Sequence, residues 1–324
     1  MSKVTLKDIA KIANISSAAV SIILNDKPSR ISEEKKAEVK KIAAELNYRP
    51  NKIARSLLST STKTIGILIP DIENPFFSKL VRDIEQTMSI EGYSTLIANS
   101  NDLYASDIHH INEFLDRQVD GIIACVSNET YLHMEEFQAF LESIDAPLVL
   151  VDRLISNVKK RQVVSDNRLG GYIATKFLLQ KNIKHLAVVT GGKNSFISNE
   201  RLKGVKQALD EIKLNIPVDF FEGDFHFQSG YDIGIHSNIL TENTGVFCFN
   251  DLMAYGLLKA NRIKNAKNIE IIGYDNLAYS DMFGINLPSI NQNIQQLAEN
   301  TVLMLQKSIK NGNEYEVLYL EPSL

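Results

Sequence analysis

Polar and aromatic side chains follow the apolar segments of residues 63–324 at the points where those segments end. They occur in the short sequences DIENPFF (71–77), VDR (151–153), NER (199–201), GDF (223–225), FND (249–251), GYD (273–275) and NQ (291–292). Carboxylate and amide groups can bind adjacent hydroxyls in pairs, arginine can donate to ring or hydroxyl oxygens, and aromatic rings can cover the apolar faces of a sugar. The set lacks a strong anion cradle, so it favours a neutral ligand over a phosphorylated one.

Eight apolar segments of strand length must position these side chains. The first four are TIGILIP (64–70), STLIAN (94–99), DGIIAC (120–125) and PLVLVD (147–152); the second four are HLAVVTG (185–191), VDFFEGD (218–224), GVFCFND (245–251) and IEIIGYD (269–275). Helical segments lie between them, which predicts an α/β fold with parallel sheets covered on both faces. Two sets of four strands predict two doubly wound lobes, as in periplasmic binding proteins. Ligands of such sheets bind beyond the carboxyl ends of the strands, here in a cleft closed by a hinge.

The chain must cross between the two lobes at least twice. We expect it to cross near VVSDN (163–167) and to return after SINQN (289–293). The first lobe is therefore expected over about 63–163 plus 294–324, so that the last helix belongs to it. The second lobe is expected over about 164–293.

The first 48 residues have the pattern of three short helices. Thr5 and Asp8 are spaced as a capping box before LKDIAKIA, Ser16 can cap SAAVSIIL (17–24), and Ser32 can cap a third helix that ends at about Leu46. Two short helices joined by a tight turn, with a third helix behind them, predict an all-α helix-turn-helix domain.

Charge is unevenly distributed along the chain. Residues 1–63 carry 13 Lys and Arg against 6 Asp and Glu, whereas the remaining residues carry 22 against 33. A basic head on an acidic body indicates a polyanionic partner for the head alone. We find no secretory signal and no apolar run near the roughly 20 residues that cross a bilayer, so we expect a cytoplasmic protein that does not bind a membrane.

Sequence motifs for catalysis and metal binding are missing. None of the six histidines has the spacing of a metal site, GGKNS (191–195) lacks the frame of a phosphate-binding loop, and no serine lies in a G-x-S-x-G turn. We therefore expect no enzyme activity, no metal and no cofactor. Cys125 and Cys248 lie in apolar runs and are expected to be buried thiols.

The head resembles the DNA-binding domain of LacI/GalR-type bacterial repressors. The resemblance rests on VTLKDIAKIANISSAAVS (4–21), LN (24–25) and LNYRPNKIARSL (46–57), and it covers the whole head. It implies that the second helix enters the major groove and that its first side chains face base edges. The DNA-binding residues of the head that it implies are Thr5, Lys7, Ser16, Ser17, Ala18, Ser21, Ile22 and Asn25. Because Ala18 and Ile22 cannot form bidentate hydrogen bonds, we expect few direct hydrogen bonds between this helix and base edges.

The same resemblance gives a role to the short segment PNKIARSLL (50–58). Isolated helices below roughly 12–15 residues are marginal in water, so this segment needs stabilisation from outside. In the family it is a hinge helix that packs against its copy from a second subunit in the minor groove. The resemblance places Asn51, Arg55 and Leu57 at the DNA, with Leu57 as the apolar wedge that kinks the duplex. An ordinary linker helix packed on the next domain is the alternative.

The strand-end residues resemble those of ribose-binding proteins and ribose-operon repressors. The effector-binding residues that this resemblance implies are Asn74, Phe76, Phe77, Asp152, Arg153, Arg201, Phe225, Asn250, Asp275 and Gln292. D-ribose is the first candidate effector, and fructose, sucrose or another neutral sugar are alternatives. Some relatives respond to the phosphorylated carrier protein HPr, so a regulator with that corepressor is a further alternative.

These patterns together predict an allosteric repressor of a sugar-utilisation operon. The expected domains are a DNA-binding head at 1–48, a hinge helix and linker at 49–62, and a sugar-binding and dimerisation domain at 63–324. Sugar is expected to close the cleft and release double-stranded operator DNA. The chain ends at LYLEPSL, without the leucine-heptad tail that forms tetramers in one branch of the family, so a homodimer with a shortened terminal edge is expected.

Overall fold

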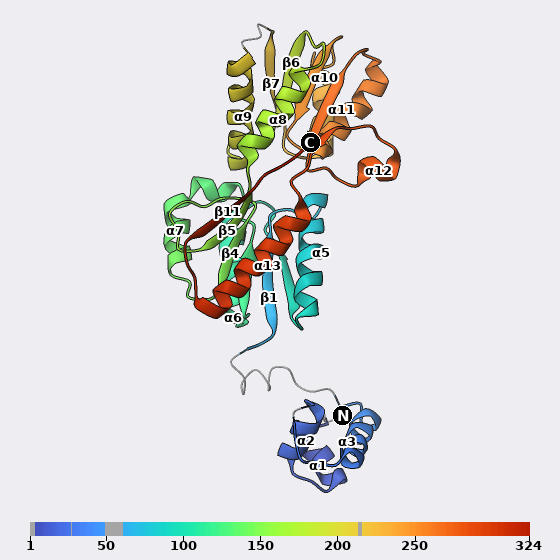
Figure 1. Ribbon diagram of the computed structural model, residues 1–324, viewed down its shortest axis with the longest axis vertical. Helices are drawn as coiled ribbons and strands as arrows, with labels where there is room; N and C mark the ends of the chain where they lie inside the picture. The colour runs from blue at the N-terminus through green and yellow to red at the C-terminus, as the bar shows by residue number, and fades with distance from the viewer. Residues whose placement is uncertain (1–3, 27, 49–60, 213–215) are drawn as a thin grey trace. The chain divides into compact units, whose positions relative to one another are not determined.

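The computed structural model describes residues 4–26, 28–48, 61–212 and 216–324. The chain divides into two compact units, residues 1–62 and 63–324 (Figure 1). Each unit has its own buried core, and each is described separately below.

The first unit contains the three predicted helices with the predicted caps. They are α1 (Leu6–Ala13), α2 (Ser17–Leu24) and α3 (Glu33–Glu45). The backbone N–H and the hydroxyl of Thr5 donate to Asp8 Oδ2 at 2.8 and 2.7 Å. The Oγ atoms of Ser16 and Ser32 accept from the first turns of α2 and α3. The core of the unit is formed by Ile9, Ala10, Ala13, Val20, Ile23, Val39 and Ala43.

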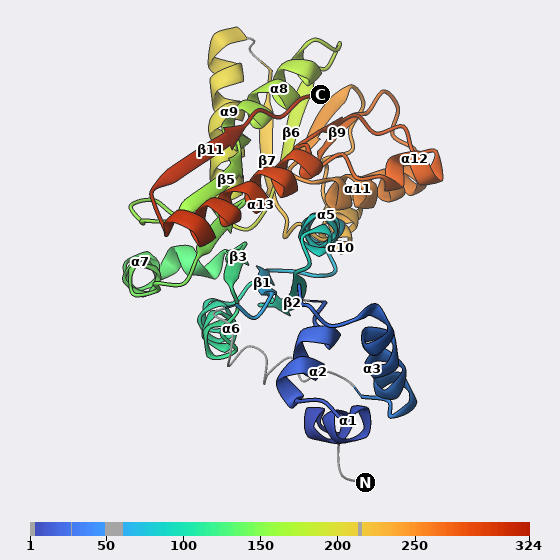
Figure 2. The same ribbon diagram turned by 60° about the horizontal axis from the view of Figure 1, so that its bottom comes forward.

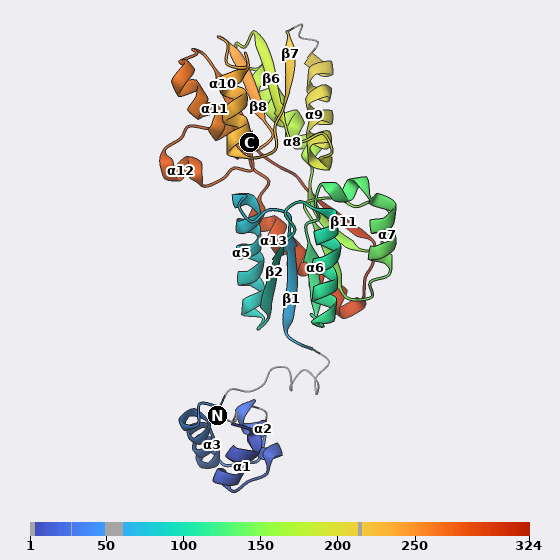
Figure 3. The same ribbon diagram turned by 180° about the vertical axis from the view of Figure 1, so that it is seen from behind.

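The first lobe of the second unit is built on a six-stranded parallel sheet. Its strands are β1 (Thr64–Ile69), β2 (Ser94–Asn99), β3 (Gly121–Ala124), β4 (Leu148–Val151), β5 (Arg161–Ser165) and β11 (Glu316–Leu320), in the order β11-β5-β4-β3-β1-β2. One face is covered by α5 (Pro75–Ile90) and α13 (Ile294–Asn311), and the other by α6 (Tyr104–Asp116) and α7 (Met134–Glu142), with η1 (Glu129–Leu132) beside them (Figures 1 and 3). All residues of β3, β4 and β5 are buried, as expected for strands covered on both faces.

The second lobe is built on a five-stranded parallel sheet. Its strands are β6 (His185–Thr190), β7 (Val218–Glu222), β8 (Thr244–Cys248), β9 (Glu270–Tyr274) and β10 (Ser289–Ile290), in the order β10-β9-β8-β6-β7. Packed helix pairs cover it: α8 (Asn167–Leu179) with α9 (Phe196–Ile212), and α10 (Phe227–His236) with α11 (Asp251–Lys264). The short helix α12 (Tyr279–Phe283) follows β9. Cys125 and Cys248 are both buried, as predicted.

The predicted count of four strands in each lobe is wrong, because β5, β10 and β11 were not predicted. The segment RQVVS of β5 begins with polar residues, yet Arg161 is only 1% exposed. Its guanidinium is neutralised by Glu314 and Glu316, at 2.5 and 3.0 Å. These partners lie more than 150 residues further along the chain, so the apolar pattern alone could not identify a buried strand there.

Three segments connect the two lobes. The chain passes from β5 to α8, from β10 back to α13, and from β11 to its end. β11 lies beside β5, and α13 packs over β4 and β5 (Figure 2). Asp166 N–H donates to the carbonyl of Leu320 at 2.9 Å, and Asn291 forms an antiparallel bridge with Ser323. The last helix therefore packs on the first sheet, as the sequence pattern predicted.

Candidate functional site

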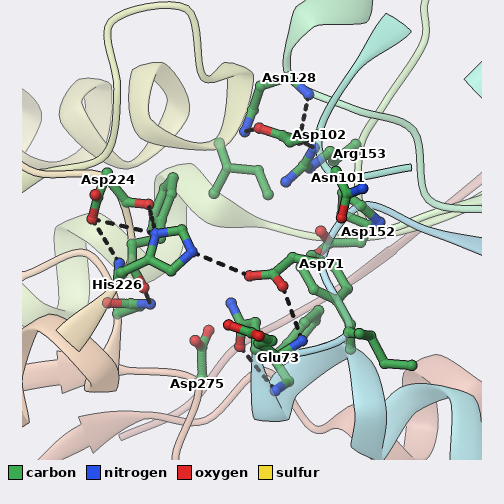
Figure 4. Close-up of a pocket in the computed structure, with 18 of the residues that line it drawn as sticks. Asp71, Glu73, Asn101, Asp102, Asn128, Asp152, Arg153, Asp224, His226 and Asp275 are labelled. Carbon is green, nitrogen blue, oxygen red and sulfur yellow. Dashed lines mark hydrogen bonds and ion pairs between the residues drawn. The ribbon is translucent and has the colours of Figure 1, made fainter. Parts of the chain in front are cut away.

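A cavity of about 400 Å³ lies at the carboxyl ends of the two parallel sheets, between the lobes (Figure 4). All ten residues that the sequence predicted for effector binding line it. The first lobe contributes Asn74, Phe76, Phe77, Asp152 and Arg153, and the second contributes Arg201, Phe225, Asn250, Asp275 and Gln292. Their convergence follows from the parallel topology, which places every strand end of a lobe at the same edge of its sheet.

The start of α5 supplies one amide and two aromatic rings. Asn74 is the N-cap of α5, and its Oδ1 accepts from Phe76 N–H at 3.0 Å. The cap uses the oxygen of the amide, so the NH₂ group stays available to a ligand. The rings of Phe76 and Phe77 pack edge to face, with centroids 5.1 Å apart, and are largely buried.

Asp152 and Arg153 follow β4 and are both buried. Asp152 has a φ of 68°, in the left-handed region that few non-glycine residues adopt. Burial raises the pKa of its carboxyl, while the charges of Arg153 and Arg201 act in the opposite direction. Arg153 Nη1 donates to Asp102 Oδ1 and to the carbonyl of Val126, each at 2.7 Å. The arginine is thereby held in one orientation against the cavity wall.

Arg201 is held from three sides at the opposite wall. Its Nε donates to Asn167 Oδ1 at 2.9 Å, and Nη1 donates to the carbonyl of Phe249. The guanidinium carbon lies 3.5 Å from the ring centroid of Tyr274, which is a cation–π contact. Gly204, one turn further along α9, allows this helix to pack closely on α8, because a Cβ there would lie 1.9 Å from a backbone oxygen of α8. The site therefore presents a rigid, desolvated cation.

Asp275 and Gln292 form a buried hydrogen-bonded pair. Gln292 Nε2 donates to Asp275 Oδ1 at 2.6 Å. Burial raises the pKa of Asp275 well above its ordinary value, although Arg201 opposes that shift. The φ of Asp275 is 105°, a strained conformation for a residue with a Cβ. Such strain persists only where the surroundings hold the residue in place, and it is frequent at ligand sites.

Asn250 links the start of α11 to Phe225. Its Oδ1 accepts from Met253 N–H at 3.0 Å, and its Nδ2 donates to the carbonyl of Phe225 at 2.7 Å. Phe225 has a φ of 69°. Its ring lies where a side chain at Gly191 would be, since a Cβ on Gly191 would come within 2.1 Å of it. The glycine after β6 is therefore needed for the aromatic wall of the cavity.

Four buried polar atoms of cavity residues have no hydrogen-bond partner in the part of the chain that the structure describes. They are Asn128 Oδ1, Asp152 Oδ1, Arg153 Nε and Gln292 Oε1. Buried polar atoms are normally paired, and an exception calls for an explanation. Hydroxyl groups can both donate and accept, so a hydroxyl-rich ligand can satisfy carboxylate, amide and guanidinium atoms at once.

Sequence reasoning missed part of the cavity. The additional lining residues are Pro70, Asp71, Ile72, Glu73, Asn99, Asn101, Asp102, Asn128, Ile197, Asp224 and His226. Most of them follow the carboxyl ends of β1, β2, β3 and β7, so the rule that identified the other residues could have found them. His226 Nε2 lies 3.5 Å from Asp71 Oδ2, and Figure 4 shows this pair among the residues that line the cavity.

Behind the cavity, Asp251 holds the loop that carries Asp275. Its two carboxyl oxygens accept from Leu277 N–H at 2.7 Å and from Ser289 Oγ at 2.6 Å. Burial raises the pKa of Asp251 from 3.8 to about 7, although these hydrogen bonds lower it. The native state therefore binds a proton more tightly than the unfolded chain between about pH 4 and pH 7.

The raised pKa of Asp251 makes the free energy of unfolding depend on pH. The free energy of unfolding contributed by Asp251 is present at low pH and is lost as the pH rises towards 7. We expect Asp251→Asn to reduce the loss of stability between pH 5 and pH 7 by roughly 2 kcal/mol relative to the wild type. Urea unfolding at several pH values measures this difference, and equal slopes in the two proteins would contradict it.

The predicted DNA-facing residues of the head lie at the start of α1 and on or near α2. Val20 and Ile23 of α2 point into the core, and Ala18 is exposed. Ser17, Ser21, Ile22 and Asn25 are half-buried, whereas Thr5, Lys7 and Ser16 are exposed. Asn25 Nδ2 donates to the carbonyl of Ser21 at 2.7 Å, so this residue also caps α2. The remaining predicted residues, Asn51, Arg55 and Leu57, lie outside the described residues.

A helix-turn-helix unit followed by a two-lobed unit with a ligand-sized cleft defines a ligand-responsive transcription regulator. The chain belongs to the LacI family of bacterial regulatory proteins. Residues 5–51 match the family model for bacterial regulatory proteins of the lacI family. Residues 62–320 match the model for periplasmic binding proteins and the sugar binding domain of the LacI family. The chain is accordingly a DNA-binding repressor of this family.

Known relatives cover nearly the whole chain. The HTH-type transcriptional repressor PurR of Vibrio parahaemolyticus is 32% identical, over 99% of this chain and 96% of the relative. The ribose operon repressor of Haemophilus influenzae is 33% identical, over 98% of this chain and 96% of the relative. A solved structure of a LacI family transcriptional regulator from Enterococcus faecium with bound ribose is 29% identical, with a TM-score of 0.68, and covers 80% of this chain and 96% of its own.

No helix in the part of the chain that the structure describes combines the length and the apolar character that a membrane span requires.

Proposed function

We propose that this protein represses a sugar-utilisation operon and that D-ribose is its effector. The observation that carries the proposal is the convergence of ten polar and aromatic residues from both lobes on one cavity. Four unpaired polar atoms in that cavity match the donors and acceptors of a polyhydroxylated ligand. The relatives named above for a ribose operon and for bound ribose support the same sugar, whereas the relative named PurR leaves room for another effector.

The charge of the cavity supports a neutral effector. Six carboxyl groups line it, from Asp71, Glu73, Asp102, Asp152, Asp224 and Asp275. The two guanidinium groups that line it, of Arg153 and Arg201, are already paired with protein oxygens. The carboxyl groups therefore outnumber the two guanidinium groups, so the lining favours a neutral ligand over a phosphate.

Cleft closure is the step that links the sugar to DNA. A sugar that contacts both lobes favours the closed arrangement, and it can shift the conformational equilibrium only by its difference in affinity for the two states. We propose that closure disorders the hinge segment at 49–62. On this proposal Asn51 and Arg55 lie at the minor groove, and Leu57 is the wedge between base pairs.

The test is release of labelled operator DNA, measured by fluorescence anisotropy at fixed salt because affinity for DNA depends on ionic strength. The operator is taken from the promoter region of the gene itself, and D-ribose, fructose, sucrose and glucose are titrated separately. Release at the lowest concentration by D-ribose is the expected result. Tight binding that no sugar changes would overturn the effector assignment and leave DNA binding intact.

Neither the cavity nor the similar proteins named above support the alternative with phosphorylated HPr as corepressor. It predicts the opposite sign, namely tighter operator binding when the carrier protein is added. The same anisotropy assay detects that outcome directly.

We further propose that the repressor is a homodimer formed along one side of the second unit. Strand β2 is an edge of the first sheet, and α5, β2 and α12 lie along the same side of the unit (Figure 3). Exposed apolar side chains gather on these elements: Ile90, Ile97, Tyr279, Met282 and Phe283. An exposed strand edge beside apolar side chains is a typical surface for association, and a second copy would cover it symmetrically.

Replacing an apolar residue on this side by a charged one should weaken the dimer. For Phe283→Glu, whose side chain is 72% exposed in the isolated chain, we expect the dimer dissociation constant to rise by at least about tenfold. Sedimentation velocity over a dilution series measures that constant. Leu132→Glu, an equally drastic change at an exposed leucine of η1, is the matched control and should leave it unchanged.

A further inference from the structure

A ring stack and an ion pair connect the two lobes in the described part of the second unit. The ring of Tyr131, from η1 of the first lobe, stacks on Phe196 at the start of α9, with centroids 5.1 Å apart and planes 5° apart. The imidazole of His226, from the second lobe, forms an ion pair with Asp71 of the first lobe at 3.5 Å (Figure 4). Neither Asp71 nor His226 belongs to the ten residues assigned to the effector.

His226 is held in position by its own lobe. Its backbone N–H donates to Asp224 Oδ1 at 2.8 Å, and its Nδ1 lies 2.9 Å from the carbonyl oxygen of Asp224. A carbonyl oxygen only accepts, so Nδ1 must carry a proton. Nε2, on the other side of the ring, lies 3.5 Å from Asp71 Oδ2, so the two groups form an ion pair when the ring is protonated. The second lobe therefore holds the ring with Nε2 directed at a carboxyl group of the first lobe.

The pair is more exposed than the other polar residues that line the cavity. The side chains of His226 and Asp71 are 55% and 28% exposed, whereas Asp152, Arg153, Arg201, Asp275 and Gln292 are at most 5% exposed. The pair thus lies at the rim. The contact of His226 with Asp224 stays within the second lobe and survives opening of the cleft, whereas the contact with Asp71 must break when the lobes separate.

We propose that His226 and Asp71, here called the rim pair, are positioning residues that hold the cleft closed over a bound sugar. This inference rests on the proposed function for the identity of the sugar. An interaction that forms only on closure slows opening, so it acts on the dissociation rate of the effector and leaves the association rate nearly unchanged. The rim pair should therefore set how much sugar is needed to release the operator. Because closure opposes operator binding, loss of the pair should not weaken operator binding in the absence of sugar.

The first experiment is a double-mutant cycle on the full-length protein with D-ribose. His226→Ala and Asp71→Ala should each raise the dissociation rate about three- to tenfold by stopped-flow fluorescence, and the double variant should be no worse than either single one. The charge-reversed double variant, Asp71→Lys with His226→Glu, should recover part of the loss. His236→Ala, an exposed histidine at the end of the same helix, is the control and should behave as the wild type. Additive effects in the cycle, or no effect of His226→Ala, would overturn the proposal.

The second readout is the dependence on pH. The charged groups within 4 Å of the His226 ring in the described chain are the carboxylates of Asp71 and Asp224. Because an ion pair with Asp71 requires a charged ring, the ratio of dissociation rates between His226→Ala and the wild type should be larger at pH 6 than at pH 8. The buried carboxyl groups titrate in both proteins, so their effect on the dissociation rate cancels in this ratio. A ratio that does not change with pH would show that the ring acts only by its shape.

A third measurement distinguishes failure of the rim pair from failure of the proposed effector. Spin labels at Glu135→Cys on α7 and Lys206→Cys on α9 report the distance between the lobes without any sugar. Labelled chains are diluted with unlabelled ones, so that a dimer carries only one labelled subunit. If calorimetry shows no binding of D-ribose to the wild type, the effector assignment is wrong. In that case the rim pair still predicts that His226→Ala shifts the distances towards the open arrangement, and identical distributions would refute it.

Discussion

Replacing Asp275 by alanine is expected to abolish the response of the repressor to sugar while operator binding stays intact. The carboxyl group is 5% exposed, accepts from Gln292 Nε2 and lines the cavity opposite Asp152 and Arg153. Its removal deletes a ligand contact and leaves a buried amide donor unpaired. These two losses together are worth roughly 3 kcal/mol, or about a 100-fold weaker affinity for the effector.

Calorimetry with D-ribose measures the affinity of Asp275→Ala for the effector. The anisotropy assay measures its affinity for operator DNA. Asp275→Asn should lose less affinity than Asp275→Ala, because an amide keeps the hydrogen-bonding shape and asparagine tolerates a positive φ better than alanine does. Asp210→Ala, at an exposed aspartate of α9 in the same lobe, is the matched control. If sugar still released the operator from Asp275→Ala at the wild-type concentration, the cavity would not be the effector site.

The second large effect is expected in the head, where Ala43→Asp should abolish specific operator binding. Ala43 is 7% exposed and packs in the small core with Ile9 and Val20. A carboxylate there is buried without a partner and costs more than about 3 kcal/mol. Domains of this size are only marginally stable, so the head should unfold. The cavity lies in the separate unit 63–324 and should still bind sugar normally.

The neighbouring residue provides a matched control for this prediction. Ala44→Asp introduces the same side chain on the exposed face of the same helix, one residue further along. Both substitutions place a negative charge near the C-terminus of α3, so the unfavourable effect on the helix dipole is common to them. We expect operator affinity within about threefold of the wild type for Ala44→Asp. Wild-type operator binding by Ala43→Asp would show that the head is not the DNA-binding unit.

The sequence by itself determined the head almost completely. The boundaries of α1, α2 and α3 agree with the prediction, and Ser16 and Ser32 cap the helices that they were expected to cap. The physical reason is that capping bonds and helical spacing act over three or four residues, so their evidence is local. Similarly, the eight long apolar strands are present, because strands covered on both faces need continuous apolar runs.

The sequence also identified ten of the residues that line the cavity, although not what they bind. Strand ends of parallel sheets meet at one edge, so a residue such as Asn250 or Asp275 could be assigned to the cavity from its position after a strand. Its role towards a sugar stays a prediction. Asp102 and Asn128 were missed because the residues that follow β2 and β3 were not considered, although the same rule applies to them.

Only the tertiary structure decided the remaining features. Surrounding contacts stabilise the positive φ angles of Asp152, Phe225 and Asp275, and no local sequence pattern predicts them. The buried strand β5 depends on ion pairs of Arg161 with residues near the end of the chain. The rim pair joins Asp71 to His226, which lie on different lobes and come together only when the two sheets face each other. Such contacts depend on how distant segments pack, and that information is not contained in any single stretch of the chain.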